Sequence, residues 1–458
     1  MPEATKVLIL GAGFAGVHVA MELERRFHDN NNVKITLVSR DNFLLFTPML
    51  HEVAASDLDV AAIVNPVRRM LRRAQFIASD VESIDLEKNQ VTVSHGFRQH
   101  KHKLDYDHLV LALGSVTNFY GLEGLEARAL TMKSLEDATK LRSRMLAHLE
   151  EADAPCSKAS ISSLLTLVVA GGGFAGVETV GGMHDFMMHA VRSYSNLRPE
   201  MVRIVLVHPG EYLLPELGEK LGRYTQDKLV KRGIEVRTGV RVTSISDEGV
   251  VLSDGSSIST TFVVWTAGTS PSPQVVCLPC QKHAGRVLTQ PTFELEEWPG
   301  VWALGDCASV PDGKGGYHPP TAQHALRQAK TLGGNIAAAI KGAQKKTFSF
   351  STIGQLATIG HRVGVARIFG IQFSGFIAWW MWRTIYLSKL PHWEKRVHVA
   401  LGWTFDLIFS KDTVQYVSFR SADSNLPSSR SGSVPDTVVA NRGVLTDVEK
   451  EHDLVLVK

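Results

Sequence analysis

Cysteine is scarce in this sequence. Its 458 residues include four cysteines, at positions Cys156, Cys277, Cys280 and Cys307. So few cysteines in so long a chain do not form the dense disulfide framework of small secreted domains, and we expect a reducing compartment. Residues 1–10 also lack the charged segment and apolar core of a signal peptide. We therefore expect the protein in the cytosol or on the membrane face that borders it.

An excess of charge of one sign is also missing. The 49 lysines and arginines nearly balance the 46 aspartates and glutamates, and the formal net charge is +3. This charge is too small to indicate a nucleic-acid partner, so none is expected. Hydrophobic residues at 44% and charged residues at 21% are ordinary for a globular protein with a sizeable core. The length suggests two or three domains.

No apolar run is long and uninterrupted enough to predict a membrane span. Gln372 and Arg383 interrupt residues 369–390, and residues 397–409 fall short of the about 20 apolar residues that a span needs. The aromatic residues of this region include Trp379, Trp380, Trp382, Tyr386, Trp393 and Trp403. Because basic residues outnumber acidic ones around them, the pattern is typical of helices lying in an anionic bilayer interface. The alternative is a Trp-rich homodimer interface, and the two are compatible.

A glycine-rich turn is present twice. Residues 167–170 form an apolar run that predicts a buried strand, and Gly171, Gly173 and Gly176 follow at GxGxxG spacing before a helix. The three glycines permit a tight turn, close approach of a pyrophosphate, and close packing of helix on strand. The pyrophosphate then lies on the free N–H groups of the helix N-terminus.

The second copy lies in residues 7–17, where Gly11, Gly13 and Gly16 follow an apolar strand and open a helix. A lone GxGxxG is weak evidence, but two copies in the strand–turn–helix context predict two dinucleotide folds. The sequence therefore predicts an α/β protein that holds two nucleotides face to face.

The ribose-binding position of the first unit departs from the usual pattern. A second strand is expected at residues 33–38, and its end is where a dinucleotide fold usually places an acid on the ribose. Here Ser39, Arg40 and Asp41 occupy this place. Either Ser39 or Asp41 is a candidate for the ribose hydroxyls.

Three further segments are candidates for contact with a cofactor. Residues 43–54 are expected to form an aromatic loop containing Pro48, which either packs on a flavin ring or belongs to the core. The strands expected at 109–114 and 262–268 end in Gly114 and Gly268. A glycine there indicates that the backbone approaches another group closely.

In the second unit the ribose position, after a strand expected at 203–207, falls on His208. An acid there would favour NADH, because it accepts a bond from the 2′-OH and repels a 2′-phosphate. A neutral histidine does neither strongly, and a protonated one would tolerate the phosphate. Glu211 is an alternative acid, so NADH is favoured and NADPH stays open.

Glu178 is expected in the first turn of the helix that follows the second glycine turn, near the place of a nicotinamide. There it either acts on the substrate or only complements the helix dipole. Later in the chain, a strand at 300–304 is followed by Gly305 and Asp306, and Asp306 can accept bonds from ribityl or ribose hydroxyls. A helix is then expected after Pro319 and Pro320, and its first N–H groups, near Thr321 to Gln323, can stabilise negative charge on a flavin ring.

From about Lys6 to Gln415 the chain resembles the type II NADH dehydrogenases, which are single-subunit, non-pumping NADH:quinone oxidoreductases with two dinucleotide folds. The resemblance is carried by GAGFAG, GGGFAGVE, WTAGTSP, ALGDCA and PPTAQHA in that order, followed by the aromatic C-terminal region. It implies two Rossmann-like domains, the second inserted in the first, and a C-terminal amphipathic membrane-binding region. It also implies hydride transfer from NADH to bound FAD, electron transfer to a membrane quinone, and a peripheral location on the cytoplasmic membrane face.

The resemblance implies roles for individual residues. It assigns FAD to Gly11, Gly13, Gly16, Gly305 and Asp306, and NADH to Gly171, Gly173, Gly176 and Glu178. The predicted cofactor-binding set also contains Ala15, Arg40, Pro48, Gly114, His208 and Gly268, with Ala322 and Gln323 beside the flavin where the quinone arrives. Glu178 and Gln323 are the catalytic candidates, and no metal site is predicted. The expected domains are 1–118 with 299–350 for FAD, 119–298 for NAD(P)H, 351–420 for the membrane, and 421–458 as a disordered tail.

Two alternatives stay open at this point. Sulfide:quinone oxidoreductases share the architecture but need a redox cysteine pair at the flavin. Cys277 and Cys280 have CxxC spacing but lie in a Pro-containing loop of the inserted unit, and the first unit has no cysteine. The second alternative is a low-turnover flavoprotein that senses redox state or docks a protein partner through its Trp-rich end.

Overall fold

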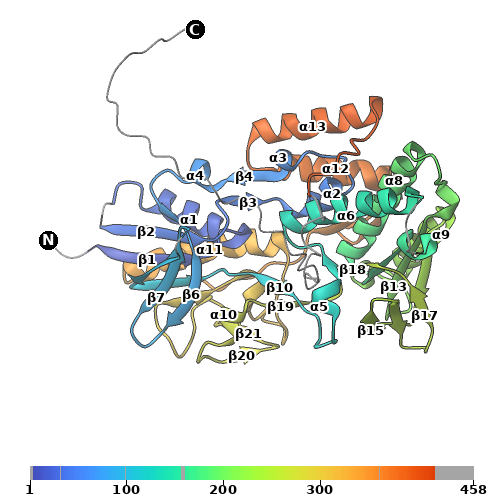
Figure 1. The fold of residues 1–458 in the computed structure, drawn as a ribbon. Coiled ribbons are helices and arrows are strands. Elements are labelled where there is room, and N and C mark those ends of the chain that lie inside the picture. Colours follow the sequence, from blue (N-terminus) through green and yellow to red (C-terminus); the bar gives the residue numbers. More distant parts are fainter. Residues whose placement is uncertain (1–3, 31, 98, 156–159, 361, 418–458) are drawn as a thin grey trace, which may run out of the picture. The chain divides into compact units, whose positions relative to one another are not determined.

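The computed structural model describes residues 4–417 except 31, 98, 156–159 and 361, and these residues belong to one compact unit. The predicted tail at 421–458 lies outside the described residues. The first sheet is parallel, in the order β22-β9-β1-β2-β5. Its strands are β1 (Thr5–Leu10), β2 (Val33–Ser39), β5 (Gln75–Ala78), β9 (His108–Leu111) and β22 (Val301–Ala303). Figure 1 shows this sheet at the left of the view.

The second sheet repeats this design with residues that lie between β9 and β22 in the chain. It is also parallel, in the order β11-β18-β12-β13-β14. Its strands are β11 (Leu130–Thr131), β12 (Thr166–Ala170), β13 (Arg203–His208), β14 (Glu235–Thr238) and β18 (Phe262–Trp265). One doubly wound unit therefore interrupts the other, and the predicted fold class is confirmed.

Three long helices begin at the carboxyl ends of these strands. α1 (Phe14–Arg26) and α8 (Phe174–Ala190) follow the two glycine turns directly, with Gly13 and Gly173 as their N-caps. α11 (Ala322–Ile340) begins after Pro319 and Pro320, as expected, and packs along α1. The first residues of all three helices, Phe14, Phe174 and Ala322, line one cavity.

The remaining elements complete the two units. Those of the first half are β3 (Phe43–Leu45), η1 (Thr47–Met49), α2 (Leu50–Ala54), α3 (Val60–Ile63), β4 (Val64–Pro66), α4 (Val67–Met70), β6 (Asp80–Asp85), β7 (Gln90–His95), β8 (His100–Asp105), β10 (Ser115–Thr117), α5 (Leu125–Arg128), α6 (Leu135–Asp153) and α7 (Ile161–Leu164). Those that follow are η2 (Val191–Ser193), η3 (Pro199–Met201), η4 (Pro215–Leu217), α9 (Glu219–Lys231), β15 (Val242–Ser246), β16 (Gly249–Leu252), β17 (Ser257–Ser259), β19 (Thr269–Pro271), α10 (Pro273–Val276), β20 (Lys282–His283), β21 (Arg286–Leu288), η5 (Gly305–Cys307) and β23 (Ala308–Ser309). The segment 43–54, expected to be a loop, is thus a short strand followed by two short helices.

The C-terminal region is a hairpin sheet followed by two helices. It consists of β24 (Gly354–Gly360), β25 (Val363–Ile368), β26 (Ile371–Gly375), α12 (Phe376–Lys389) and α13 (Trp393–Ile408). The helix expected from residue 369 begins only at Phe376, because Gly370 and Gly375 have positive φ angles and residues 371–375 pair with β25. Among the described residues, none of the helices has the length and apolar character that crossing a bilayer requires.

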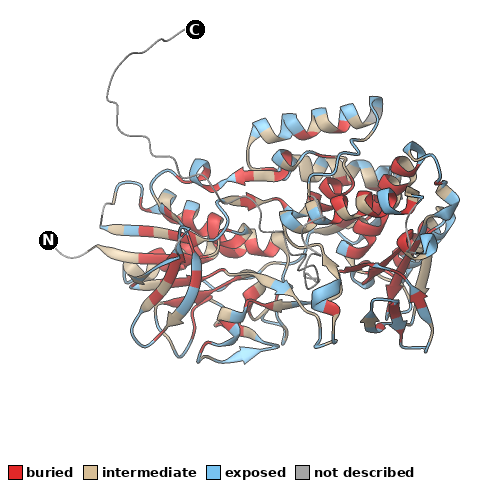
Figure 2. Cartoon of the chain, viewed as in Figure 1, coloured by how far each residue is buried: buried red, intermediate tan, exposed pale blue. Residues whose placement is uncertain are grey.

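The hydrophobic core joins the C-terminal region to the inserted unit. α8 lies so close to β24 that a Cβ on Gly181 would stand 2.6 Å from the carbonyl oxygen of Ile359. Trp382 of α12 and Trp403 of α13 are buried in the same core cluster as α8, whereas Trp380 and Trp393 are exposed. Figure 2 shows the outer surface of α13 as largely exposed. The aromatic residues predicted as one interfacial group therefore divide into buried and exposed sets.

Candidate functional site

The two glycine turns have the same geometry. Gly11 and Gly171 have φ angles of +101° and +115°, which L side chains rarely adopt. A Cβ on Gly16 or Gly176 would lie 1.8 or 1.7 Å from the carbonyl oxygen of the turn's first glycine. These glycines are required by the protein's own backbone.

The middle glycine of each turn is different. Gly13 and Gly173 have ordinary φ angles of −74° and −78°, and a Cβ built on either meets no protein atom within 4 Å. Nothing in the protein therefore requires glycine there. The open space lies at the first free N–H groups of α1 and α8, where a pyrophosphate binds in this fold. The residues present thus fit one dinucleotide at each turn.

Asp306 lies beside the first turn. Ser115 donates a hydrogen bond of 2.8 Å to its carboxylate, and Lys133 Nζ is 3.9 Å from the same oxygen. The neighbouring Gly305 N–H donates to Gln328 Oε1 at 2.9 Å, and a Cβ on Gly305 would stand 3.3 Å from that of Ala15. The structure therefore brings Gly305 and Asp306 to the start of α1, as the sequence suggested.

The two predicted ribose positions are built differently. Arg40 is exposed at the end of β2, and its only recorded partner among the described residues is Asp41, at 3.8 Å. His208 is buried at the end of β13 and accepts a hydrogen bond of 3.2 Å from the Gly172 N–H at Nδ1. Burial lowers the pKa of His208, so its ring is neutral at pH 7 and offers no positive charge to a 2′-phosphate. Glu211 is exposed nearby in the chain.

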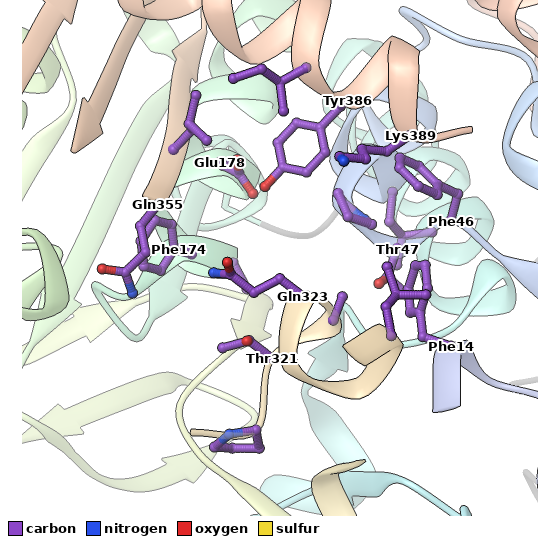
Figure 3. Close-up of a pocket in the computed structure, with 18 of the residues that line it drawn as sticks. Phe14, Phe46, Thr47, Phe174, Glu178, Thr321, Gln323, Gln355, Tyr386 and Lys389 are labelled. Carbon is purple, nitrogen blue, oxygen red and sulfur yellow. The ribbon is translucent and has the colours of Figure 1, made fainter. Parts of the chain in front are cut away.

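A cavity of about 1070 Å³ lies where the N-terminal ends of α1, α8 and α11 meet α12. Figure 3 shows side chains from these elements facing its interior. The predicted residues that line it are Pro48, Glu178, Gly268, Thr321, Ala322 and Gln323. The glycine turns, Gly114, His208 and Asp306 lie outside its lining. Gly114 has a φ of +66° with open space at its Cβ, while a Cβ on Gly268 would strike the Tyr120 ring.

Glu178 is an acidic residue in the lining of this cavity. α8 begins at Phe174, so Glu178 lies beyond the first turn, and its predicted position there is wrong. Its Oε1 accepts hydrogen bonds from Trp382 Nε1 at 3.2 Å and from the Thr358 N–H at 3.3 Å. Burial raises the pKa of Glu178 to about 8, so the carboxyl is mainly protonated at pH 7.

Gln323 connects the start of α11 to the C-terminal sheet. Its Nε2 donates to the Gly354 carbonyl at 3.1 Å, and its Oε1 accepts from the Ile353 N–H at 3.4 Å. Figure 3 shows Gln323 across the cavity from Glu178 and Tyr386. The two predicted catalytic side chains thus face one space.

Comparison with known proteins shows the family to which this chain belongs. The family model described as pyridine nucleotide-disulphide oxidoreductase matches residues 5–329, and the NDH2 C-terminal domain matches residues 353–412. The type II NADH:quinone oxidoreductase of Mycobacterium tuberculosis is 31% identical over 426 residues, which cover 90% of this chain and 89% of that protein. The chain belongs to the type II NADH:quinone oxidoreductases.

Other similar proteins agree with this assignment. A probable NADH dehydrogenase of Dictyostelium discoideum is 30% identical over 418 residues, covering 90% of this enzyme and 91% of the relative. The structure of NDH2 from Plasmodium falciparum in complex with NADH superposes with a TM-score of 0.83 at 20% identity. The matched region covers 90% of this chain and 100% of the Plasmodium falciparum chain, which shows that the two share a fold.

The three cysteines that the structure describes lie away from the cavity of this type II enzyme. Cys277 is exposed and Cys280 is partly exposed after α10, and neither lines the cavity. Cys307 is buried in the core, where burial raises the pKa of its thiol to about 11. Cys156 lies outside the described residues. The arrangement does not favour the sulfide:quinone alternative.

Several site residues of this enzyme were missed in the sequence. His51 of α2 lines the cavity, with Nδ1 3.7 Å from Glu178 Oε2, and Trp382 bonds the other oxygen of the same carboxyl. Tyr386 packs against Trp382 and Phe46, with ring centroids 5.0 and 6.2 Å away. The one available signal was the segment 43–54, suggested as a possible flavin contact, which contains Phe46 and His51.

Proposed function

We propose that this chain carries two electrons from NADH through bound FAD to a membrane quinone. One observation carries the proposal: two glycine turns of the same geometry, each open at its middle glycine, flank a single cavity. When bound, FAD accepts a hydride from the nicotinamide and passes two electrons to the quinone. The protein supplies position, charge and protons around that chemistry.

We assign the first turn to FAD and the second to NADH. Gly11, Gly13, Ala15 and Gly16 with Gly305 and Asp306 hold FAD, and Arg40, Pro48 and Gly114 extend that site. Gly171, Gly173 and Gly176 with His208 and Gly268 hold NADH. Ala322 and Gln323 hold the flavin side of the quinone site, because the first N–H groups of α11 and the Gln323 amide face the cavity.

The second site favours NADH over NADPH. His208 is neutral and supplies no positive charge at the end of β13, and the exposed acids Glu211 and Glu216 follow it in the chain. A carboxylate there can accept a hydrogen bond from a 2′-hydroxyl, whereas it would repel a 2′-phosphate.

We expect NADH, and not sulfide, to reduce the quinone. Because Cys280 lies outside the cavity, Cys280→Ser should leave the NADH-dependent rate within about twofold of the unchanged enzyme. The check is a parallel assay of both donors with a short-chain quinone. Sulfide-dependent quinone reduction that disappears in Cys280→Ser would reverse the assignment.

We propose that the C-terminal helices bind this peripheral enzyme to the membrane surface. On α13 the exposed residues Trp393, Val397, Leu401, Phe405 and Ile408 recur every three or four positions and form one apolar stripe. Such a stripe beside basic residues binds the interfacial region of a bilayer. The cytoplasmic face and a homodimer remain predictions.

Leu401→Glu should weaken vesicle binding at least about tenfold, since it puts a charge where an apolar side chain is buried in lipid. Val230→Glu on α9 is the matched control, because it changes another exposed apolar residue to the same acid. Co-flotation with anionic vesicles measures both variants. Equal flotation of the two would contradict the membrane role of the stripe.

A further inference from the structure

Two acids of this enzyme, Glu178 at the cavity and the buried Glu52, each accept a hydrogen bond from a tryptophan of the C-terminal helices. Trp382 of α12 donates from Nε1 to Glu178 Oε1 at 3.2 Å, and Trp403 of α13 donates from Nε1 to Glu52 Oε2 at 3.0 Å. Trp382 is 1% exposed and Trp403 is 6% exposed. A buried indole N–H needs a hydrogen-bond acceptor, and here a carboxyl group supplies it in both cases.

Within the part of the chain that the structure describes, the hydrogen-bond donors to Glu178 all bond to one carboxyl oxygen. Oε1 accepts from Trp382 and also from the Thr358 N–H of β24 at 3.3 Å. The other carboxyl oxygen, Oε2, lies 3.7 Å from His51 Nδ1. In a protonated carboxyl, the oxygen that accepts two N–H bonds is the carbonyl oxygen, so the hydroxyl is Oε2.

We propose that Trp382 is a positioning residue, whose indole N–H fixes the Glu178 carboxyl so that Oε2 carries the transferable proton at the cavity wall. The inference rests on the proposed quinone reaction. Reduction of a quinone to a quinol takes two electrons and two protons, and the hydride of NADH supplies both electrons and one proton. The second proton comes from solution, and Glu178 passes it on and is then reprotonated from water.

The surroundings of Glu178 favour its protonated form. Burial is the main cause of its raised pKa, the bonds from Thr358 and Trp382 lower it, and the Glu52 charge raises it. Other titratable groups of the same cavity lining are His51, whose pKa burial lowers to about 3, Tyr386, whose pKa burial raises, and Lys389. Neither His51 nor Tyr386 is charged at pH 7, so neither changes protonation state in the range where Glu178 titrates.

Trp382→Phe in the full-length, FAD-loaded enzyme tests the inference. We expect oxidation of the flavin by a short-chain quinone to slow about tenfold, with flavin reduction by NADH unchanged. Loss of an N–H donor destabilises the carboxylate, so the pKa of Glu178 rises. In the pH profile of the rate of flavin oxidation by quinone, the alkaline limb should move to higher pH by as much as about one unit.

Trp403→Phe is the matched control, because it removes the same N–H group from Glu52. It should not move the alkaline limb of the pH profile upward, because a Glu52 that ionises less readily repels the Glu178 carboxylate less. Rates are referred to bound FAD in both variants. Infrared difference spectroscopy gives a readout independent of turnover. The carboxyl band that disappears in Glu178→Gln should shift in Trp382→Phe and not in Trp403→Phe.

The inference would be overturned if Trp382→Phe and Trp403→Phe had equal effects on the alkaline limb of the pH profile and on the infrared band of the Glu178 carboxyl. That result would leave the proposed function intact as long as Glu178→Gln still slows the quinone step. If Glu178→Gln has no effect on either half-reaction, the proposed role of Glu178 itself fails.

Discussion

Gly13→Ala yields an enzyme without FAD, whereas Gly173→Ala yields an enzyme that keeps FAD and no longer uses NADH. Both glycines have φ angles that alanine adopts freely, and neither Cβ touches the protein, so both variants should fold. The added methyl group instead enters the space of a pyrophosphate. For Gly173→Ala we expect kcat/KM for NADH to fall roughly 100-fold.

The two variants serve as controls for each other, because they make the same change in two equivalent turns. Flavin absorbance measures FAD content, and stopped-flow reduction by NADH measures the second site. If Gly173→Ala lost FAD and Gly13→Ala kept it, the cofactor assignment of the two folds would be reversed. If neither had an effect, the open spaces would not be nucleotide sites.

Glu178→Gln should slow the reaction with quinone by about 100-fold, while FAD content stays normal. Glutamine keeps the shape of the side chain and an oxygen for the bonds from Trp382 and Thr358, but it has no proton to give. In the unchanged enzyme the raised pKa of about 8 keeps the acid form below that pH. The quinone step should therefore be level near pH 7 and fall as the pH rises through 8.

Separate measurement of the two half-reactions decides what Glu178 does. A slow quinone step with normal flavin reduction supports proton donation. Slow flavin reduction by NADH would show instead that Glu178 orients the nicotinamide. Unchanged rates in both steps would remove Glu178 from the mechanism.

The architecture was predictable from the sequence because its signals are local. An apolar strand, three glycines at fixed spacing and a helix occupy adjacent residues, and the structure has them at Gly11 to Gly16 and at Gly171 to Gly176. The same holds for the turn at Gly305 and the helix that begins at Ala322. Each of these features depends on backbone geometry that few other residues permit.

The composition of the cavity wall was not predictable in this way. His51, Glu178 and Trp382 are far apart in the chain, and no local pattern indicates that their side chains meet. Trp382 and Trp403 were counted with the membrane-facing aromatics, because composition does not tell which face of a helix is buried. The buried face of α12 is determined by its packing on the C-terminal sheet and on the core that contains α8.

Anaerobic titration of the purified enzyme with NADH, followed by a short-chain quinone, tests the central claim most directly. If the two nucleotide folds meet at one cavity, NADH should bleach the flavin absorbance at one equivalent per FAD, and quinone should restore it. NADPH should bleach it far more slowly. A colourless protein, or a flavin that stays oxidised with both reduced nucleotides, would contradict the account.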